Sequence, residues 1–256
     1  MGSRTPLRLP VIDFSKPNLK PGSPEWDSVK SQVRKALEEF GCFEALFDKV
    51  PVELRKSIFG ALEALFDLPL QTKLRNLSKK PFHGYVGQYP QVPLYESMGI
   101  DDANIIEKVE SMTNNLWPEG KESFSKTIVS FSEQVSELDQ TIRRMILESF
   151  NLEKDRDEHM NSTNYLLRVT ILYQNQVDGL EVQTKNGEWI QLKPSPDSFI
   201  AMIGDSLYAW TNGRLYSPYH RVMMTGNEAR YSAGLFSIPK AAGQRAQSAL
   251  KTYCGV

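Results

Sequence analysis

The first half of the chain has apolar residues spaced as they are on one face of an α-helix. After Ser23, apolar side chains recur every three or four positions across residues 26–40, which predicts a helix with one buried face. Ser23 can cap this helix, with Pro24 in its first turn, and Gly41 is expected to end it. Residues 54–65 repeat the pattern and predict a second helix.

A longer apolar stripe runs from Phe124 to Phe150, in a third helix predicted to begin near Ser123. Such a stripe is compatible with a coiled-coil seam and with the buried face of a helix that packs on a sheet. A single helix without a sustained pattern of flanking charges is poor evidence for a dimer, so packing on a sheet is favoured. A helical interaction module built on residues 123–150 stays open as an alternative.

The second half changes to short apolar segments with the alternation of strands. Strands are expected at residues 169–173, 179–183, 188–192, 199–203, 207–210, 220–224 and 231–238, in addition to a short one at 9–14. Asn186-Gly187 between two of them is a strong signal for a two-residue hairpin. Many short strands separated by turns predict a sandwich or jelly roll. Helices followed by strands, without alternation, argue for an α+β fold and against a doubly wound parallel sheet.

The composition argues against several classes of partner. The 256 residues are 40% hydrophobic, enough for a sizeable core, and 30 basic residues against 31 acidic ones give a net charge of −1. This balance gives no electrostatic reason to expect nucleic acid or an anionic membrane as partner. No run of eighteen apolar residues is present to span a bilayer. The two cysteines, Cys42 and Cys254, lie far apart in sequence, which favours the reducing cytoplasm over a disulfide scaffold.

Three histidines, His83, His159 and His220, are the imidazoles from which a metal site could draw. His220 begins a predicted strand, and Arg230 and Ser232 lie two positions apart and therefore on one face of the next strand. A guanidinium beside a hydroxyl is a good grip for a carboxylate. If the turn between the strands is tight, His220 and this grip face one cavity. The alternative is a strand histidine with satisfied hydrogen bonds and a surface arginine in an ion pair.

Eight short segments, spread over nearly the whole chain, match motifs of one enzyme family. They are residues 9–14, 40–43, 67–73, 84–85, 169–182, 212–214, 220–222 and 230–232. With these segments the chain resembles plant 2-oxoglutarate- and iron(II)-dependent dioxygenases. The most similar branch is the alkenyl- and hydroxyalkyl-producing (AOP-type) group, which acts on glucosinolate side chains.

The resemblance implies a double-stranded β-helix, or jelly roll, with an N-terminal cap region at residues 1–120 and a long helix plus the jelly roll at 121–256. It implies an oxidoreductase of plant secondary metabolism that uses O2, 2-oxoglutarate and Fe(II) on a small-molecule substrate, with ascorbate as a further candidate cofactor. Two histidines and one carboxylate hold the iron in this family. His220 matches the distal iron ligand, and Arg230 and Ser232 match the clamp for the C5 carboxylate of 2-oxoglutarate.

The chain departs from the family pattern at the other half of the iron site. No His-x-Asp motif occurs, and Arg168 is followed directly by Val169 where the family carries that motif. A second segment is absent between Pro239 and Gly243. One imidazole does not hold Fe(II), because affinity comes from several preplaced ligands acting together. His220 is therefore the one metal ligand expected, and no residue is assigned as catalytic.

The two absent segments have well-matched flanks, which indicates an alternative transcript or a gene-model product. Neither His83 nor His159 has a carboxylate two residues further on, so neither is expected to replace the missing pair. Loss of a strand also leaves its neighbours with unpaired main-chain groups and exposed apolar faces. We expect an incomplete jelly roll with impaired activity. The alternative is an inactive isoform that keeps only a scaffold for a ligand or a partner.

Overall fold

The computed structural model describes residues 7–80 and 83–239 of the chain. Its helices are α1 (Pro24–Glu39), α2 (Val52–Phe66), α3 (Leu70–Lys73), α4 (Ile106–Leu116), α5 (Glu122–Ser149), the 3₁₀ turn η1 (Glu153–Asp155), α6 (Arg156–Asn161) and α7 (Asp205–Trp210). Its strands are β1 (Val11–Asp13), β2 (Cys42–Leu46), β3 (Gly84–Gly87), β4 (Glu96–Asp101), β5 (Thr163–Gln174), β6 (Leu180–Gln183), β7 (Trp189–Gln191), β8 (Ser198–Met202), β9 (His220–Val222) and β10 (Ser232–Pro239). Cys254 and Gly243, before which a second segment is predicted to be absent, lie outside the described residues.

Helix α1 begins and ends where the sequence predicted. The Oγ atom of Ser23 accepts a hydrogen bond from the backbone N–H of Trp26 at 3.1 Å, which caps the first turn. Gly41 follows the helix with a φ of +70°, a conformation that is strained for a residue with a side chain. A Cβ atom at this position would also lie 2.2 Å from the carbonyl oxygen of Tyr216. Only glycine therefore fits between the helix and the segment that precedes β9.

Helix α5 lies at the centre of the hydrophobic core. Phe131, Val135 and Leu138 on its apolar stripe are fully buried. The ring of Phe131 packs against Tyr173 of β5 and Phe199 of β8, with centroids 6.1 and 6.5 Å away. The stripe thus packs on the sheet as predicted, and the coiled-coil and interaction-module alternatives are wrong because its apolar face is already covered. In the described part of the chain, every helix falls short of the length and apolar content that a membrane span needs.

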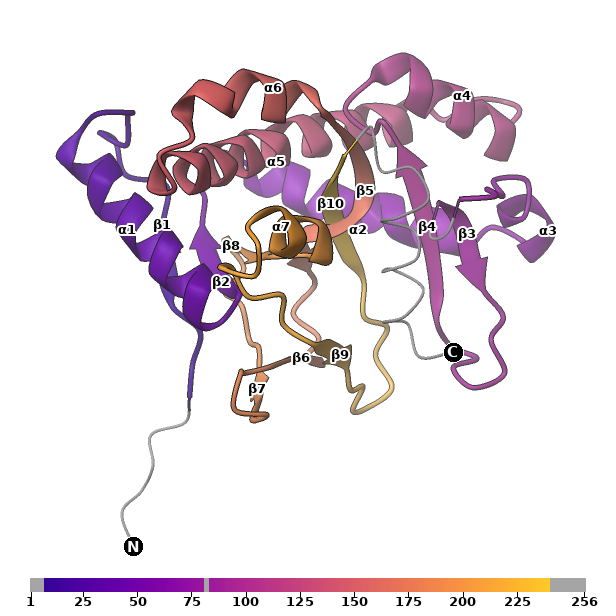
Figure 1. Ribbon diagram of the computed structural model, residues 1–256. Helices are drawn as coiled ribbons and strands as arrows, with labels where there is room; N and C mark the ends of the chain where they lie inside the picture. The colour runs from indigo at the N-terminus through magenta and orange to yellow at the C-terminus, as the bar shows by residue number, and fades with distance from the viewer. Residues whose placement is uncertain (1–6, 81–82, 240–256) are drawn as a thin grey trace, which may run out of the picture.

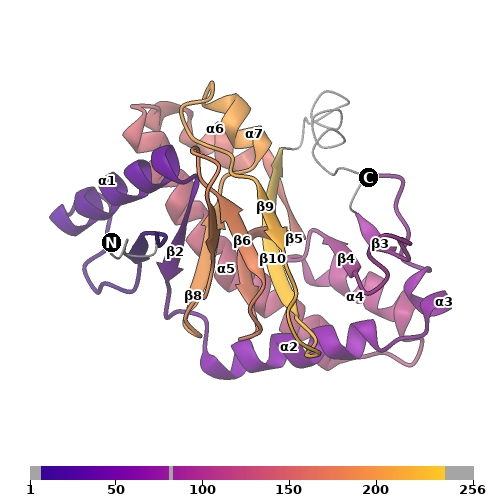
Figure 2. The same cartoon turned by 90° about the horizontal axis from the view of Figure 1, so that it is seen from below.

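Two sheets lie face to face, which confirms the α+β fold with a jelly roll. The larger sheet has the order β1-β2-β8-β5-β4-β3, with β10 also paired to β5, and the smaller has the order β7-β6-β9. Figure 2 shows the strands stacked in front of α5, so this helix covers one face of the larger sheet. The other face meets the smaller sheet through a second buried cluster. That cluster contains Leu9, Cys42, Leu172, Leu180, Val182, Ile190, Leu192 and Ile200.

Strand β5 changes neighbours half-way along its length. At Leu167 its first half pairs with β4 on one edge and with β10 on the other. At Leu172 its second half pairs with β8 and again with β10. On β10 the consecutive residues Gly234 and Leu235 face Leu172 and Leu167, respectively. Residues 168–171 therefore carry the backbone from one edge of β10 to the other, a crossing that can be followed in Figure 1.

This crossing lies at the junction of Arg168 and Val169, where the sequence indicated an absent segment. Both halves of β5 are antiparallel to β10 and are therefore parallel to each other. Parallel strands in one sheet are ordinarily joined by a dozen or more residues, and here only residues 168–171 join them. The short crossing is the structural counterpart of the absent segment.

One strand prediction is wrong, and one hairpin that the sequence left open does not form. Residues 207–210 belong to α7, which begins after Gly204 and leaves Trp210 exposed rather than alternating across a sheet. The strands predicted at 220–224 and 231–238 do not form a hairpin with each other, because β9 pairs with β6 and β10 pairs with β5. Each strand thus joins a different sheet.

The predicted hairpin at Asn186-Gly187 is confirmed between β6 and β7. Gly187 adopts a φ of +83°, as a tight turn requires. The loop is longer than the expected two residues, because the Thr184 N–H donates to the Glu188 carbonyl at 2.9 Å and encloses residues 185–187.

Phe150, the residue after α5, connects the helical half with the segment after α7. The guanidinium carbon of Arg34 on α1 lies 3.7 Å from the centre of its ring, and that of Arg214 lies 4.1 Å from it. Two guanidinium groups this close to one ring centre must occupy opposite faces. The aromatic ring therefore separates two like charges and attracts both.

Substitution of Phe131 tests the central position of α5. Phe131→Ala is expected to lower the free energy of unfolding by about 3–5 kcal/mol, because it removes a fully buried ring and leaves a cavity. Denaturant unfolding followed by circular dichroism measures this change. The matched control is Glu133→Ala on the exposed side of the same helix, with an expected change within about 0.5 kcal/mol. Equal losses in both variants would contradict the packing described here.

Candidate functional site

His220 lies at the start of β9, at one edge of the smaller sheet. Its neighbour across the ladder is Val182 of β6, and its Nδ1 atom lies 3.4 Å from the carbonyl oxygen of Pro218. The side chain is exposed. Within residues 7–80 and 83–239 no strand pairs with the other edge of β9. The expected open edge beside a lost strand is therefore found next to the predicted iron ligand.

Arg230 and Ser232 lie together at the start of β10, in the larger sheet. The Nη2 atom of Arg230 donates to Oε1 of Gln174 at 2.5 Å, and Ser232 is the residue opposite Gln174 across the ladder. Asn175 holds the preceding turn: its backbone N–H donates to the carbonyl of Tyr231, and its Oδ1 accepts from the N–H of Tyr231, both at 3.1 Å. The end of β5 thus fixes the position of Arg230.

The Nε–H group of Arg230 is a buried hydrogen-bond donor whose acceptor is missing among the described residues. It has no hydrogen-bond partner in the part of the chain that the structure describes. Burial lowers the pKa of this guanidinium, because desolvation disfavours its charge, but arginine still remains protonated in proteins. A buried cation with a spare N–H is best satisfied by an anionic acceptor. A carboxylate, which can accept two parallel hydrogen bonds from Nε and an Nη atom, fits this group.

The two halves of the predicted site lie on different sheets. His220 is on β9 in the smaller sheet, whereas Arg230 and Ser232 are at β10 in the larger one. The tight hairpin that would have faced them into one cavity is not formed. A joint role of the three residues stays a prediction.

Metal ligands are too few among the described residues. No three side chains of His, Cys, Asp or Glu gather there closely enough to hold a metal ion. His83 contacts the carboxylate of Asp101 through Nδ1, and the ring of His159 packs against Trp210 with centroids 4.8 Å apart. Each of these histidines therefore has its own local partner. The iron site that the family pattern implies does not fit the residues present.

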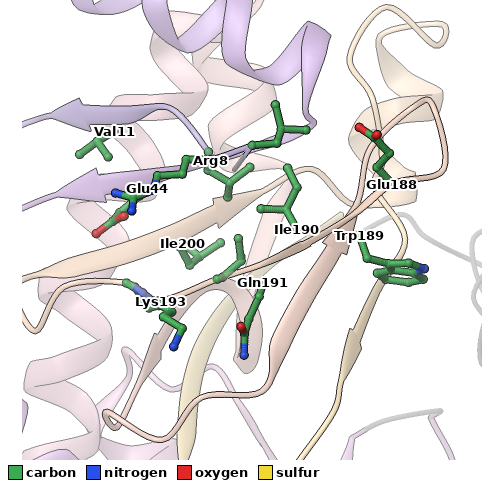
Figure 3. Close-up of a pocket in the computed structure, with 13 residues that line it drawn as sticks. Arg8, Val11, Glu44, Glu188, Trp189, Ile190, Gln191, Lys193 and Ile200 are labelled. Carbon is green, nitrogen blue, oxygen red and sulfur yellow. The ribbon is translucent and has the colours of Figure 1, made fainter. Parts of the chain in front are cut away.

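A cavity of about 950 Å³ lies away from these residues, between β7 and the edge of the larger sheet. Figure 3 shows Ile190 of β7 and Ile200 of β8 among the side chains that line it. Its lining mixes apolar residues with charges of both signs and contains neither His220 nor Arg230 nor Ser232. This cavity is therefore not the site to which the motif residues belong.

Gln174 is a site residue that the sequence analysis missed. Its side chain is 4% exposed and accepts the hydrogen bond that positions Arg230. A signal was present, because Gln174 ends an apolar strand two residues after Leu172, on the same face of it. A polar amide at a buried strand position needs a polar partner.

Comparisons with known proteins identify the family. The model of the 2OG-Fe(II) oxygenase superfamily matches residues 143–239, and that of the non-haem dioxygenase in morphine synthesis N-terminal region matches residues 9–120. "Probable 2-oxoglutarate-dependent dioxygenase AOP1.2" of Arabidopsis thaliana is 56% identical, over 91% of the chain and 81% of its own length. The chain belongs to the 2OG-Fe(II) oxygenase superfamily. The predicted resemblance to AOP-type dioxygenases, which depend on 2-oxoglutarate, is thereby confirmed.

Two further Arabidopsis thaliana relatives of this superfamily differ in their described activity. "2-oxoglutarate-dependent dioxygenase AOP3" is 33% identical over 100% of the chain and 99% of its own length. "Probable inactive 2-oxoglutarate-dependent dioxygenase AOP2" is 35% identical over 94% of the chain and 87% of its own length. Sequences at this distance thus include proteins described as active and as inactive.

Solved oxygenase structures share the fold. A dioxygenase for auxin oxidation from rice is 27% identical with a TM-score of 0.74, over 91% of this chain and 84% of its own. The 2-oxoglutarate complex of an auxin-oxidation dioxygenase from Arabidopsis thaliana has a TM-score of 0.76 at 22% identity, over 91% of this chain and 93% of its own. The large and small sheets of this chain therefore have the oxygenase arrangement.

The alignments also show that residues are absent from this chain. The alignment with AOP1.2 has 264 positions, whereas 91% of 256 residues is about 233, so about 31 positions have no residue of this chain. The alignment with AOP3 has 411 positions for a chain of 256 residues. About 31 positions are enough for a strand and its connections, which agrees with the absent segment that the sequence predicts.

His159 makes stability depend on pH. Burial first, and then the nearby charge of Arg143, lower the pKa of His159 below 6.5, while Asp139 opposes the shift. Since the unfolded chain then binds a proton that the folded chain does not, stability is present above pH 6.5 and is lost as the pH falls below it. His159→Phe keeps a ring against Trp210 and removes the titration.

Denaturant unfolding at about pH 7.5 and about pH 5.5 measures this effect. The parent chain is expected to lose more stability on acidification than His159→Phe. The same loss in both proteins would show that His159 does not carry the dependence.

Proposed function

We propose that this chain is a 2-oxoglutarate-dependent dioxygenase of plant secondary metabolism that is impaired, because it keeps the anchor for 2-oxoglutarate but too few ligands for Fe(II). The proposal rests on the buried, unpartnered Nε of Arg230, in a chain whose described residues gather no three metal ligands. In a complete member of this lineage the substrate is a small apolar or amphipathic metabolite that is oxidised with O2. Residues 1–120 form the cap region and residues 121–256 the long helix and the jelly roll.

Arg230 and Ser232 are assigned to the C5 carboxylate of 2-oxoglutarate. The Nη2 atom of Arg230 carries two N–H groups, so one can donate to Gln174 while the other, together with the Nε–H, forms two parallel hydrogen bonds with a carboxylate. Ser232 faces the same Gln174 across the ladder and adds a hydroxyl donor. These residues bind and orient the acid without help from a metal.

His220 is assigned as the one remaining iron ligand. Fe(II), when bound in this superfamily, supplies the chemistry that activates O2. A lone imidazole gives neither the affinity nor the geometry that three preplaced ligands provide. No catalytic step is therefore assigned to any residue of this chain.

The second candidate function is a non-catalytic isoform that keeps a scaffold for a ligand or a partner. The crossing at residues 168–171 favours it, because the fold accommodates the loss of a whole segment without losing its core. A relative at 35% identity is described as a probable inactive dioxygenase, which supports this candidate. A cytoplasmic location is part of both proposals, because Cys42 is a buried free thiol and suits a reducing compartment.

Binding of 2-oxoglutarate tests the anchor. The chain is expected to bind 2-oxoglutarate in metal-free buffer, as measured by isothermal titration calorimetry. Arg230→Gln is expected to weaken binding by about 10- to 150-fold, since a hydrogen bond to a charged group contributes about 1.5–3 kcal/mol. The matched control is Arg221→Gln, whose side chain pairs with Glu181 on an exposed face. Equal affinity of Arg230→Gln and the parent chain would refute the assignment.

Addition of iron tests the impairment. Under anaerobic conditions, Fe(II) and 2-oxoglutarate are expected to give no charge-transfer absorption with this chain, and no succinate after O2 is admitted, because the ligands are too few. AOP1.2 from Arabidopsis thaliana, treated in the same way, is the positive control. Charge-transfer absorption together with succinate release from the 256-residue chain would show that it is an active enzyme.

A further inference from the structure

The free edge of β9 presents main-chain groups that no described strand pairs. On the other edge the ladder with β6 continues one residue beyond β9, because the Met223 N–H donates to the Gly179 carbonyl at 2.8 Å. In an antiparallel ladder alternate residues bond to the same neighbour. The N–H and C=O groups of His220, Val222 and Met224 therefore point away from β6, to the side where the described part of the chain places no strand.

The same edge is accessible and carries apolar side chains. Every residue from 220 to 229 is exposed, so the described part of the chain leaves room for a partner to approach. Val222 is 47% exposed, and Met223 and Met224 are 50% and 46% exposed. An accessible strand edge with apolar side chains is a template for the addition of another strand.

Arg221, the central residue of β9, does not guard this edge with its charge. Its Nε atom donates to Oε2 of Glu181 on β6 at 2.7 Å, and its guanidinium carbon lies 4.0 Å from the centre of the Trp189 ring on β7. Both partners belong to strands on the side of β9 that lies opposite to the free edge. Charged side chains commonly keep natural sheet edges apart, and here the charge is paired and directed away from the edge.

The free edge is complementary to a second copy of itself. When two copies of β9 run antiparallel about a two-fold axis through Val222, the two Val222 residues face each other and His220 faces Met224. These residues all have outward main-chain groups, so each facing pair can exchange both of its hydrogen bonds. Arg221 then faces Met223 of the second copy, and no like charges meet. An axis through Arg221 would instead bring two arginines together, which is destabilising.

We infer that the free edge of β9 binds the same edge of a second copy of this chain and forms a two-fold symmetric dimer. The sheet order β7-β6-β9 then continues into β9-β6-β7 of the second copy. Because the contact uses the same edge in both copies, it closes at two chains and does not propagate. The inference goes beyond the proposed function, because the contact requires neither 2-oxoglutarate nor a metal.

Opposite charges at position 222 test both the contact and its axis. Sedimentation velocity is expected to show a monomer–dimer equilibrium of the full chain. Val222→Asp and Val222→Lys are each expected to weaken self-association at least about tenfold, because two like charges then face each other. An equimolar mixture of the two variants is expected to restore the dimer, because opposite charges meet on the axis. The control Glu133→Lys, on the exposed side of α5, keeps the equilibrium of the parent chain.

Several outcomes would overturn the inference. A parent chain that is monomeric at all concentrations excludes the dimer, and a dimer that both charged variants leave intact has its contact elsewhere. A mixture of Val222→Asp and Val222→Lys that stays monomeric excludes an axis through Val222. A monomeric full chain that dimerises only after residues 240–256 are removed assigns the edge to that segment. None of these outcomes bears on binding of 2-oxoglutarate, so the proposed function is tested separately.

A disulfide test remains decisive if the charged variants fail to fold, as checked by circular dichroism. Facing residues that exchange hydrogen bonds have Cα atoms about 5.5 Å apart, which a disulfide can span. Val222→Cys, in a chain with Cys254→Ser, is expected to give a covalent dimer on oxidation with diamide, whereas Glu133→Cys in the same background stays monomeric. Cys42 is buried and does not compete. Equal cross-linking of the two variants, or none with Val222→Cys, overturns the inference.

Discussion

Strand β10 needs hydrogen-bonding partners along both of its edges, and a single segment, β5, supplies both. Its backbone groups lie in the middle of the larger sheet, where an unpaired N–H or C=O is costly. The two halves of β5 meet this requirement because residues 168–171 pass from one edge of β10 to the other. The sheet is therefore continuous from β8 to β4, and α5 finds an unbroken surface on which to pack.

The larger sheet with its core and the smaller sheet around His220 differ in how completely their strands are paired. The core around α5 is built from the first half of the chain and from strands that are all present. The grip around Arg230 also survives, because Gln174 and Asn175 lie at the end of β5 beyond the crossing. The smaller sheet has three strands in the described part of the chain. His220 lies on the strand at its open edge. The larger sheet is thus continuous, whereas His220, the predicted metal ligand, lies at an edge with no paired strand in the described part of the chain.

Much of the fold could be predicted because local pattern and final packing agree. Local geometry accounts for the cap at Ser23, the helix end at Gly41 and the apolar stripe on α5. The tertiary contacts of these residues favour the same structure. The prediction of a strand at residues 207–210 was wrong because an apolar segment of four residues does not distinguish a strand from a short helix. The pairing of β9 and β10 with different sheets could not be predicted either, because the turn between them resembles a hairpin and their partners, β6 and β5, lie about 40 and about 60–75 residues earlier.

Only those residues of the candidate site that belong to sequence motifs could be predicted. His220, Arg230 and Ser232 could be named from the resemblance, whereas the hydrogen bond from Arg230 to Gln174 depends on a register between β5 and β10 that no local pattern contains. The missing His-x-Asp could be noticed in the sequence, but its effect on the fold could not. The crossing depends on the pairing of both halves of β5 with β10, a strand about 60–75 residues later in the sequence.

The ring of Phe150 acts as an electrostatic spacer. Arg34 and Arg214 approach it from opposite faces, so the negative faces of its π-system stand between two cations that would otherwise repel. An aliphatic residue of similar volume would fill the space but would not offset that repulsion. The position therefore demands an aromatic quadrupole, which is a requirement of charge distribution and not of size.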